Sequence, residues 1–178
     1  MNEVQPLKST ADIARMKSAL QGRDLLLFIV GINSSLRISD ILTLKVSDFN
    51  GDHIVLTEQK TGKRKAIRIN NAIKDAVATL VPSDASPDDY IFPSRKGSAP
   101  ISRVQAWRIL NNAASRAGIS IAFGTHTLRK TFAYFAYQHG TDLSLLMRVL
   151  NHSSQRETLR YIGIEAENID DVYCSVCL

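Results

Sequence analysis

The hydrophobic pattern changes from a helical period to a period of two between residues 52 and 69. His53–Thr57 and Lys65–Ile69 alternate apolar and polar side chains on either side of Thr61-Gly62-Lys63. Two such segments joined by a short glycine-containing loop predict an antiparallel hairpin. Because the other apolar segments have helical spacing, we predict an α+β fold, mostly helical with one small antiparallel β-sheet.

The predicted helices follow from apolar spacing and from residues suited to helix ends. Thr10, Ser102 and Thr125 are candidate N-caps, and Gly118 and Gly140 are candidate terminators. We predict helices over residues 10–21, 23–33, 39–44, 70–80, 102–117, 126–138, 142–150, 155–161 and 166–176. There is no internal repeat or convincing linker, so we expect a single domain over 1–178, with residues 164–178 as a C-terminal tail helix.

The charge of the chain is informative about its partner. Its 178 residues carry a formal net charge of +5, and a chain of this length can bury roughly 70% of the surface that its unfolded form exposes. Residues 60–68 include five cations, and 94–98 form a second basic loop. A basic balance favours a polyanionic partner, although it is also found in ribosomal proteins and at solvated hairpin tips.

Several classes of protein are disfavoured. The longest apolar run, Leu25–Ile32, stops after eight residues, whereas a membrane span needs about 18. The N-terminus lacks the form of a signal peptide. A zinc site needs about four ligands, and the chain has no second pair of ligands to join Cys174 and Cys177. We therefore expect an intracellular protein with inert thiols, no metal site and no cofactor.

Four residues near the C-terminal end have side chains suited to attack on a phosphodiester. Tyr161 lies nine positions after His152, and Arg129 lies 23 positions before it in His126-Thr-Leu-Arg129. Displacing an alkoxide from phosphorus requires an in-line nucleophile, stabilisation of negative charge and a proton for the leaving oxygen. A hydroxyl, two imidazoles and a guanidinium can meet these needs.

The order of motifs along the chain resembles the catalytic domain of the tyrosine recombinase (phage integrase) family. The matching segments are Leu36–Asp40, Gln59–Lys63, Thr125–Thr131, Asn151–Ser154 and Arg160–Ile162. Each motif alone is weak, but together they span the chain from about residue 11 to 163 in the family's order. The resemblance implies the same mostly helical α+β architecture.

The resemblance implies a role for each matched residue. Tyr161 would be the nucleophile, Arg37 and Arg129 would hold the phosphate, and Lys60 would protonate the leaving 5′ oxygen. Rigid guanidinium forks suit bidentate binding of phosphate. His126 would act as base or hydrogen-bond donor and His152 as a second donor, while Asp40 would orient neighbouring groups. We assign DNA contacts to Lys63, Arg64, Lys65, Arg95 and Lys96.

Some of these assignments have rivals. Lys63 and Lys65 are alternatives for the acid. Tyr90, Tyr134, Tyr137 and Tyr173 are competing tyrosines; packing explains the first three, and only Tyr161 has the family's spacing. The chain also departs from the family pattern. Asn151 replaces the usual glycine before the second histidine, and Thr127 replaces a common aspartate. Neither removes a reacting group, but both concern local positioning.

The resemblance implies a site-specific recombinase that cleaves and rejoins double-stranded DNA through a 3′-phosphotyrosyl intermediate, in integration or excision. Alternatives are an enzyme similar to type IB topoisomerases, a non-catalytic DNA-binding regulator on the same fold, and a basic RNA-binding protein. We expect a cytoplasmic, nucleoid-associated protein. The resemblance implies that it assembles on DNA as a tetrameric synapse, and it can be monomeric when free. We also expect no N-terminal core-binding domain, and a tail that docks on a neighbouring protomer or folds back.

Overall fold

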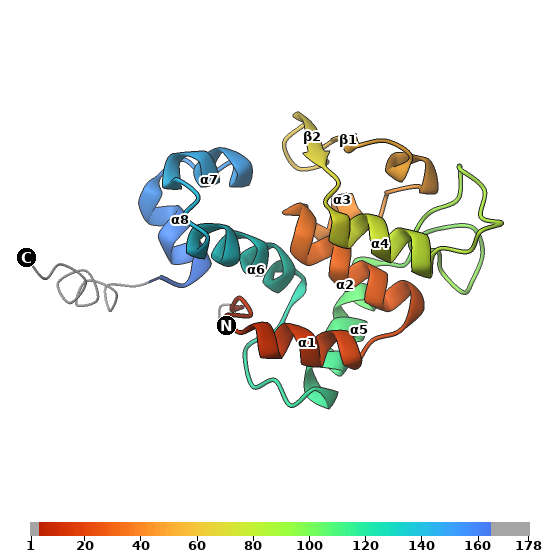
Figure 1. The fold of residues 1–178 in the computed structure, drawn as a ribbon, viewed down its shortest axis with the longest axis horizontal. Coiled ribbons are helices and arrows are strands. Elements are labelled where there is room, and N and C mark those ends of the chain that lie inside the picture. Colours follow the sequence, from red (N-terminus) through yellow and green to blue (C-terminus); the bar gives the residue numbers. More distant parts are fainter. Residues whose placement is uncertain (1–3, 165–178) are drawn as a thin grey trace, which may run out of the picture.

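The structure is a computed structural model and describes residues 4–164. The described elements are α1 (Thr10–Ser18), α2 (Gly22–Ser34), α3 (Ile38–Ile41), the 3₁₀ helix η1 (Val46–Phe49), β1 (His53–Thr57), β2 (Arg64–Arg68), α4 (Asn71–Leu80), α5 (Arg103–Arg116), α6 (Thr125–Gln138), α7 (Leu143–Leu150) and α8 (Gln155–Ile162). In the view of Figure 1, β1 and β2 lie above α3 and α4, and α6, α7 and α8 are grouped to the left of these elements. The predicted α+β class is confirmed.

The hairpin buries one face. β1 and β2 pair antiparallel, with Ile54 opposite Ile67 and Leu56 opposite Lys65. Ile54 is fully buried, and Leu56 and Ile67 pack against the same core cluster. Successive strand residues point to opposite faces, so Lys65 lies on the inward face together with Ile67. The predicted DNA contact Lys65 is therefore under the hairpin, whereas Lys63 and Arg64 are exposed.

Three adjoining core clusters organise the helices. One lies between α2, α3, α4 and the hairpin, a second between α1, α2, α5 and the start of α6, and a third between α6, α7 and α8. Helix α2 contributes to the first two clusters and contacts α6. A Cβ on Gly31 would lie 2.4 Å from Cδ1 of Leu128, so this glycine allows the close approach of α2 and α6.

Most predicted helices are present with small differences at their ends. Ser9, and not Thr10, caps α1, since its hydroxyl accepts from the N–H of Ala11 at 3.1 Å. Thr125 is already helical, so Gly124 holds the N-cap position of α6. Helix α3 is a single turn over 38–41, shorter than predicted, and η1 was not predicted. The tail helix predicted for 166–176 lies outside the described residues, and so do Cys174 and Cys177.

None of the helices between residues 4 and 164 is long and apolar enough to cross a bilayer.

Candidate active site

Residues from five parts of the fold converge beside the C-terminal end of α2. Arg37 directly precedes α3, His126 and Arg129 lie on α6, and Tyr161 lies on α8. His152 is in the loop between α7 and α8, and Lys60 is in the turn between β1 and β2. These residues lie close together, since burial lowers the pKa of His126 and the charges of Arg129, Arg37 and Lys60 lower it further. Tyr161 lies beside Arg129 and His152. The fold thus brings the six predicted catalytic residues to one region, and their roles stay predictions.

Arg129 is the most constrained member of the set. Its side chain is buried, and its Nη2 donates to the carbonyl of Leu150 at 2.7 Å while Nη1 donates to the carbonyl of Ser35. These bonds tie α6 to the ends of α2 and α7. Burial lowers the pKa of Arg129, and the positive charge of Arg37 acts in the same direction. A charge held in this way can serve an anion without reorganising.

Tyr161 lies beside Arg129 and packs on His152. The two rings are 4.9 Å apart between centroids and nearly perpendicular, and Nζ of Lys130 lies 5.0 Å from the centre of the tyrosine ring. The phenol oxygen is buried and makes no well-aligned hydrogen bond within residues 4–164. Burial raises the pKa of Tyr161, and the adjacent Arg129 opposes this rise only in part. The hydroxyl is therefore protonated at neutral pH and needs a base to become a nucleophile.

Both histidines are biased toward the neutral form. His126 is exposed overall, but protein atoms around its ring desolvate it and lower its pKa, as do the charges of Arg129 and Lys130. Burial also lowers the pKa of His152, against the opposing charge of Glu157. The Nδ1 of His152 lies 3.0 Å from the Thr158 hydroxyl, which fixes the ring orientation. A neutral imidazole can accept a proton.

The turn that carries Lys60 is held by buried acids. Lys60 itself is exposed. Asp40 is buried, and its Oδ1 accepts from the backbone N–H of Gln59 at 3.0 Å. Asp40 therefore contacts the backbone directly before Lys60, in keeping with the expected orienting role.

Sequence reasoning missed Glu58, a carboxylate with no solvent exposure. Its Oε1 lies 2.9 Å from Nη1 of Arg37 and 3.8 Å from Nζ of Lys65. Its Oε2 accepts from the hydroxyl of Thr61 at 2.7 Å and from Nδ2 of Asn151 at 3.0 Å. Burial alone would raise the pKa of Glu58, but Thr61, Arg37 and Lys65 together lower it, so it is ionised at neutral pH.

Lys65 lies inside the site. Its Nζ donates to the carbonyl of Val149 at 2.9 Å, and the side chain is only 18% exposed. Burial lowers its pKa, and the positive charge of Arg129 adds to this effect. Lys65 therefore holds the hairpin against the end of α7, in a setting unlike that of Lys63 and Arg64.

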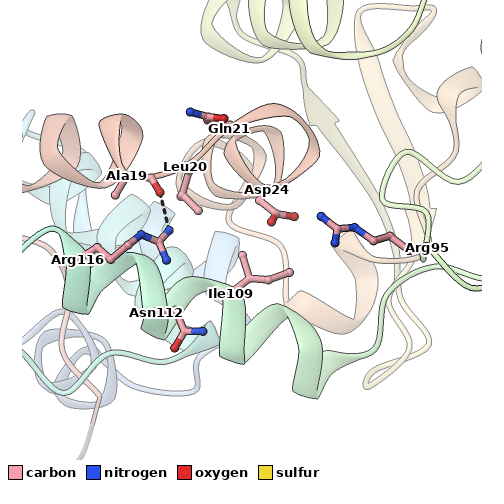
Figure 2. Close-up of a pocket in the computed structure, with 8 residues that line it drawn as sticks. All are labelled: Ala19, Leu20, Gln21, Asp24, Arg95, Ile109, Asn112 and Arg116. Atoms are coloured by element: carbon pink, nitrogen blue, oxygen red, sulfur yellow. Dashed lines mark hydrogen bonds between the residues drawn. The ribbon is translucent and has the colours of Figure 1, made fainter.

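Arg95 and Lys96 lie away from the converging residues. Arg95 lines a 470 Å³ pocket between the end of α1, the start of α2 and α5, together with Asp24 and Arg116 (Figure 2). This pocket is at the N-terminal end of α2, whereas Arg129 bonds to Ser35 just after its C-terminal end. A helix of this length separates the two regions by about 20 Å.

Within residues 4–164, no three His, Cys, Asp or Glu side chains are grouped so that they could hold a metal ion.

Comparison with known proteins gives consistent matches. The model of the phage integrase family matches residues 2–168. The chain is 46% identical over 177 residues to the probable integrase/recombinase YoeC of Bacillus subtilis (strain 168), covering 97% of each protein. Among solved structures, XerA recombinase has a TM-score of 0.78 at 20% identity, and XerH recombinase in a post-cleavage complex with palindromic difH substrate has 0.77 at 19%. The match to XerA includes 98% of this chain and 65% of the XerA chain. The match to XerH includes 97% of this chain and 53% of the XerH chain.

Proposed function

Because this chain belongs to the phage integrase family, we propose that it is a site-specific DNA recombinase that cleaves and rejoins strands through a 3′-phosphotyrosyl link to Tyr161. The observation that carries this function is the placement of the buried Tyr161 hydroxyl beside the fixed guanidinium of Arg129, with the His152 ring against it. A nucleophile and a phosphate-binding charge thus share one site.

The proposed cleavage step uses each group once. The phenol oxygen of Tyr161 attacks phosphorus and loses its proton to neutral His126. Arg37 and Arg129 stabilise the charge on the non-bridging oxygens, with His152 as a further donor. The bond from phosphorus to the 5′ oxygen breaks, and Lys60 protonates that oxygen. Attack on the phosphotyrosine by a 5′ hydroxyl reverses the step, so resealing needs no nucleotide.

Double-stranded DNA is the proposed partner. The exposed cations Lys63 and Arg64 flank the site on the hairpin. Arg95 and Lys96 are also exposed but lie near the N-terminal end of α2, so they would meet phosphates farther from the cleavage site. The family match and the XerH complex with its difH substrate support this partner. We further propose that the chain acts as one catalytic domain in an assembly on DNA, a tetramer in the synapse, within the nucleoid of the cytoplasm.

Lys60→Ala tests the assignment of the general acid. With nicked DNA that has an oxygen leaving group, we expect cleavage to slow by about 10²-fold, a typical contribution of proton transfer. A 5′-bridging phosphorothiolate does not need this proton, so the defect should nearly disappear. Rates of covalent adduct formation on the two substrates measure the difference.

Lys63→Ala is the matched control for Lys60→Ala, because Lys63 is an exposed lysine of the same turn. It should weaken DNA binding and slow both substrates alike. A defect specific to the oxygen leaving group in Lys63→Ala, and none in Lys60→Ala, would transfer the role of the acid to Lys63.

The lowered pKa of His126 predicts how the rate of cleavage changes on the acid side of its pH profile. At DNA concentrations below the Kd, the rate of adduct formation reports the free protein. If neutral His126 is the base, this rate should stay level as pH falls through about 6.5, the usual pKa of histidine, and decline only at lower pH. His126→Gln should be slower and lack this decline. A decline centred above 6.5 would contradict the assignment.

A further inference from the structure

Glu58 is a buried, ionised group that the cleavage steps above do not use. It lies between the hairpin turn and the loop after α7, because Oε2 accepts from Thr61 on one side and from Asn151 on the other. Glu58 and Asn151 are 93 positions apart. A fully buried carboxylate is unfavourable unless it is paired and hydrogen-bonded, and here it joins two segments that carry reacting groups.

On the hairpin side, Glu58 fixes the backbone around Lys60. Its carbonyl accepts from the N–H of Gly62 at 2.8 Å, and its side chain accepts from the hydroxyl of Thr61 at 2.7 Å. The residue before Lys60 is held by Asp40. The exposed Lys60 side chain therefore extends from a turn whose backbone is anchored on both sides.

On the loop side, Asn151 directly precedes His152 and has a positive φ of 55°. Glycine adopts this backbone conformation readily, and asparagine is among the few other residues that tolerate it. A glycine at position 151 would keep the backbone but would lack the amide that donates to Glu58. The amide contact is thus separable from the conformation of the loop.

The Arg37 side of Glu58 is different. Nη1 of Arg37 lies 2.9 Å from Oε1, but neither atom has a well-aligned hydrogen bond within the described residues. The contact is an ion pair without a directed bond. Nη1 of Arg37 is therefore held beside Glu58, and the other nitrogens of the guanidinium are the donors left for phosphate in the proposed cleavage step.

We propose that Asn151 and Glu58 form a positioning contact that sets the Lys60 turn relative to the His152 loop, so that the proton donor and the phosphate-binding groups face the same phosphate. This inference rests on the proposed strand cleavage. Asn151 and Glu58 are positioning residues, since they act through Lys60, Arg37 and His152.

Asn151→Gly is the test, with the full chain and nicked DNA carrying either an oxygen or a 5′-bridging sulfur leaving group. Losing a hydrogen bond to a charged group should slow cleavage of the oxygen substrate by about tenfold, because Lys60 is less well placed. The sulfur substrate needs no proton and should slow by at most about twofold. A purely structural role would slow both substrates equally, and that result would overturn the inference.

A reciprocal pair provides the matched control. In Asn151→Asp, a second carboxylate faces Glu58, so we expect a larger loss than in Asn151→Gly. Adding Glu58→Gln restores a donor and an acceptor across the same contact. The double variant should therefore cleave the oxygen substrate at least severalfold faster than Asn151→Asp alone. No recovery in the double variant would overturn the pairing of these two side chains.

Hydrogen exchange of the free protein gives a readout that does not depend on cleavage. In Asn151→Gly, amides of residues 58–63 should exchange faster, whereas those of α5 should not change. Unchanged exchange in the turn would overturn the inference even if the protein cleaves DNA. If wild-type protein forms no adduct through Tyr161 but the exchange difference is present, the proposed function fails while the contact between turn and loop stands.

Discussion

Tyr161→Phe is expected to abolish the covalent adduct with nicked suicide DNA, a loss of at least about 10³-fold, as when a nucleophile is removed. Only the phenol oxygen is lost, and the cationic groups around it remain. DNA affinity should therefore stay within about twofold. Adduct formation is measured by gel shift after denaturation, and affinity by equilibrium binding at fixed salt, because phosphate contacts make affinity depend strongly on salt.

The same variant should not lose stability. The Tyr161 hydroxyl is buried without a well-aligned hydrogen bond inside residues 4–164. Arg129 beside it keeps its bonds to the carbonyls of Ser35 and Leu150, so removing the hydroxyl should cost little stability. We expect the melting temperature to stay unchanged or to rise slightly. This separates loss of chemistry from loss of fold.

Tyr134→Phe is the matched control for the nucleophile. Tyr134 packs on the same core cluster as Tyr161, and its variant should form the adduct at the wild-type rate. Mapping the adduct to Tyr134 would contradict the assignment. An intact protein that binds DNA but never forms an adduct would be a regulator, and relaxation of plasmids without strand exchange would indicate a topoisomerase.

The sequence predicted the hairpin and the helices that carry the site because these depend on local patterns. Alternation around Thr61–Lys63 indicated the strands, and the spacing of His126 and Arg129 placed both on one helix. The same alternation also indicates two buried charged residues. Ile54 and Leu56 face inward, so continuing the period of two would also place Glu58 inward, and Ile67 would do the same for Lys65.

Other features of the site depend on tertiary contacts that no local pattern encodes. The bond from Asn151 to Glu58 joins residues 93 positions apart, and Arg129 reaches carbonyls of Ser35 and Leu150 that belong to separate helix ends. The sequence showed only that Asn151 stood where glycine is usual. The positive φ at position 151 explains why glycine is usual there and why asparagine can replace it.

Arg129→Ala is expected to slow the chemical step on the order of 10²-fold or more, which is typical for removal of a preorganised transition-state donor. It should also destabilise the fold. The carbonyls of Ser35 and Leu150 lose a charged donor, and an unsatisfied buried acceptor costs about 1–3 kcal/mol. Relief from burying the guanidinium, whose pKa burial lowers, offsets part of this loss, so we expect a melting temperature lower by several degrees.

Arg15→Ala is the control for removal of an arginine, because Arg15 is an exposed residue of α1 that pairs with Asp12. It should change neither the adduct rate nor the melting temperature appreciably. Adduct formation by Arg129→Ala is to be compared at a temperature well below its own midpoint, where the variant is folded. If its rate there equals that of wild type, Arg129 serves only to join α6 to the ends of α2 and α7, and the phosphate must be stabilised by Arg37 with other groups.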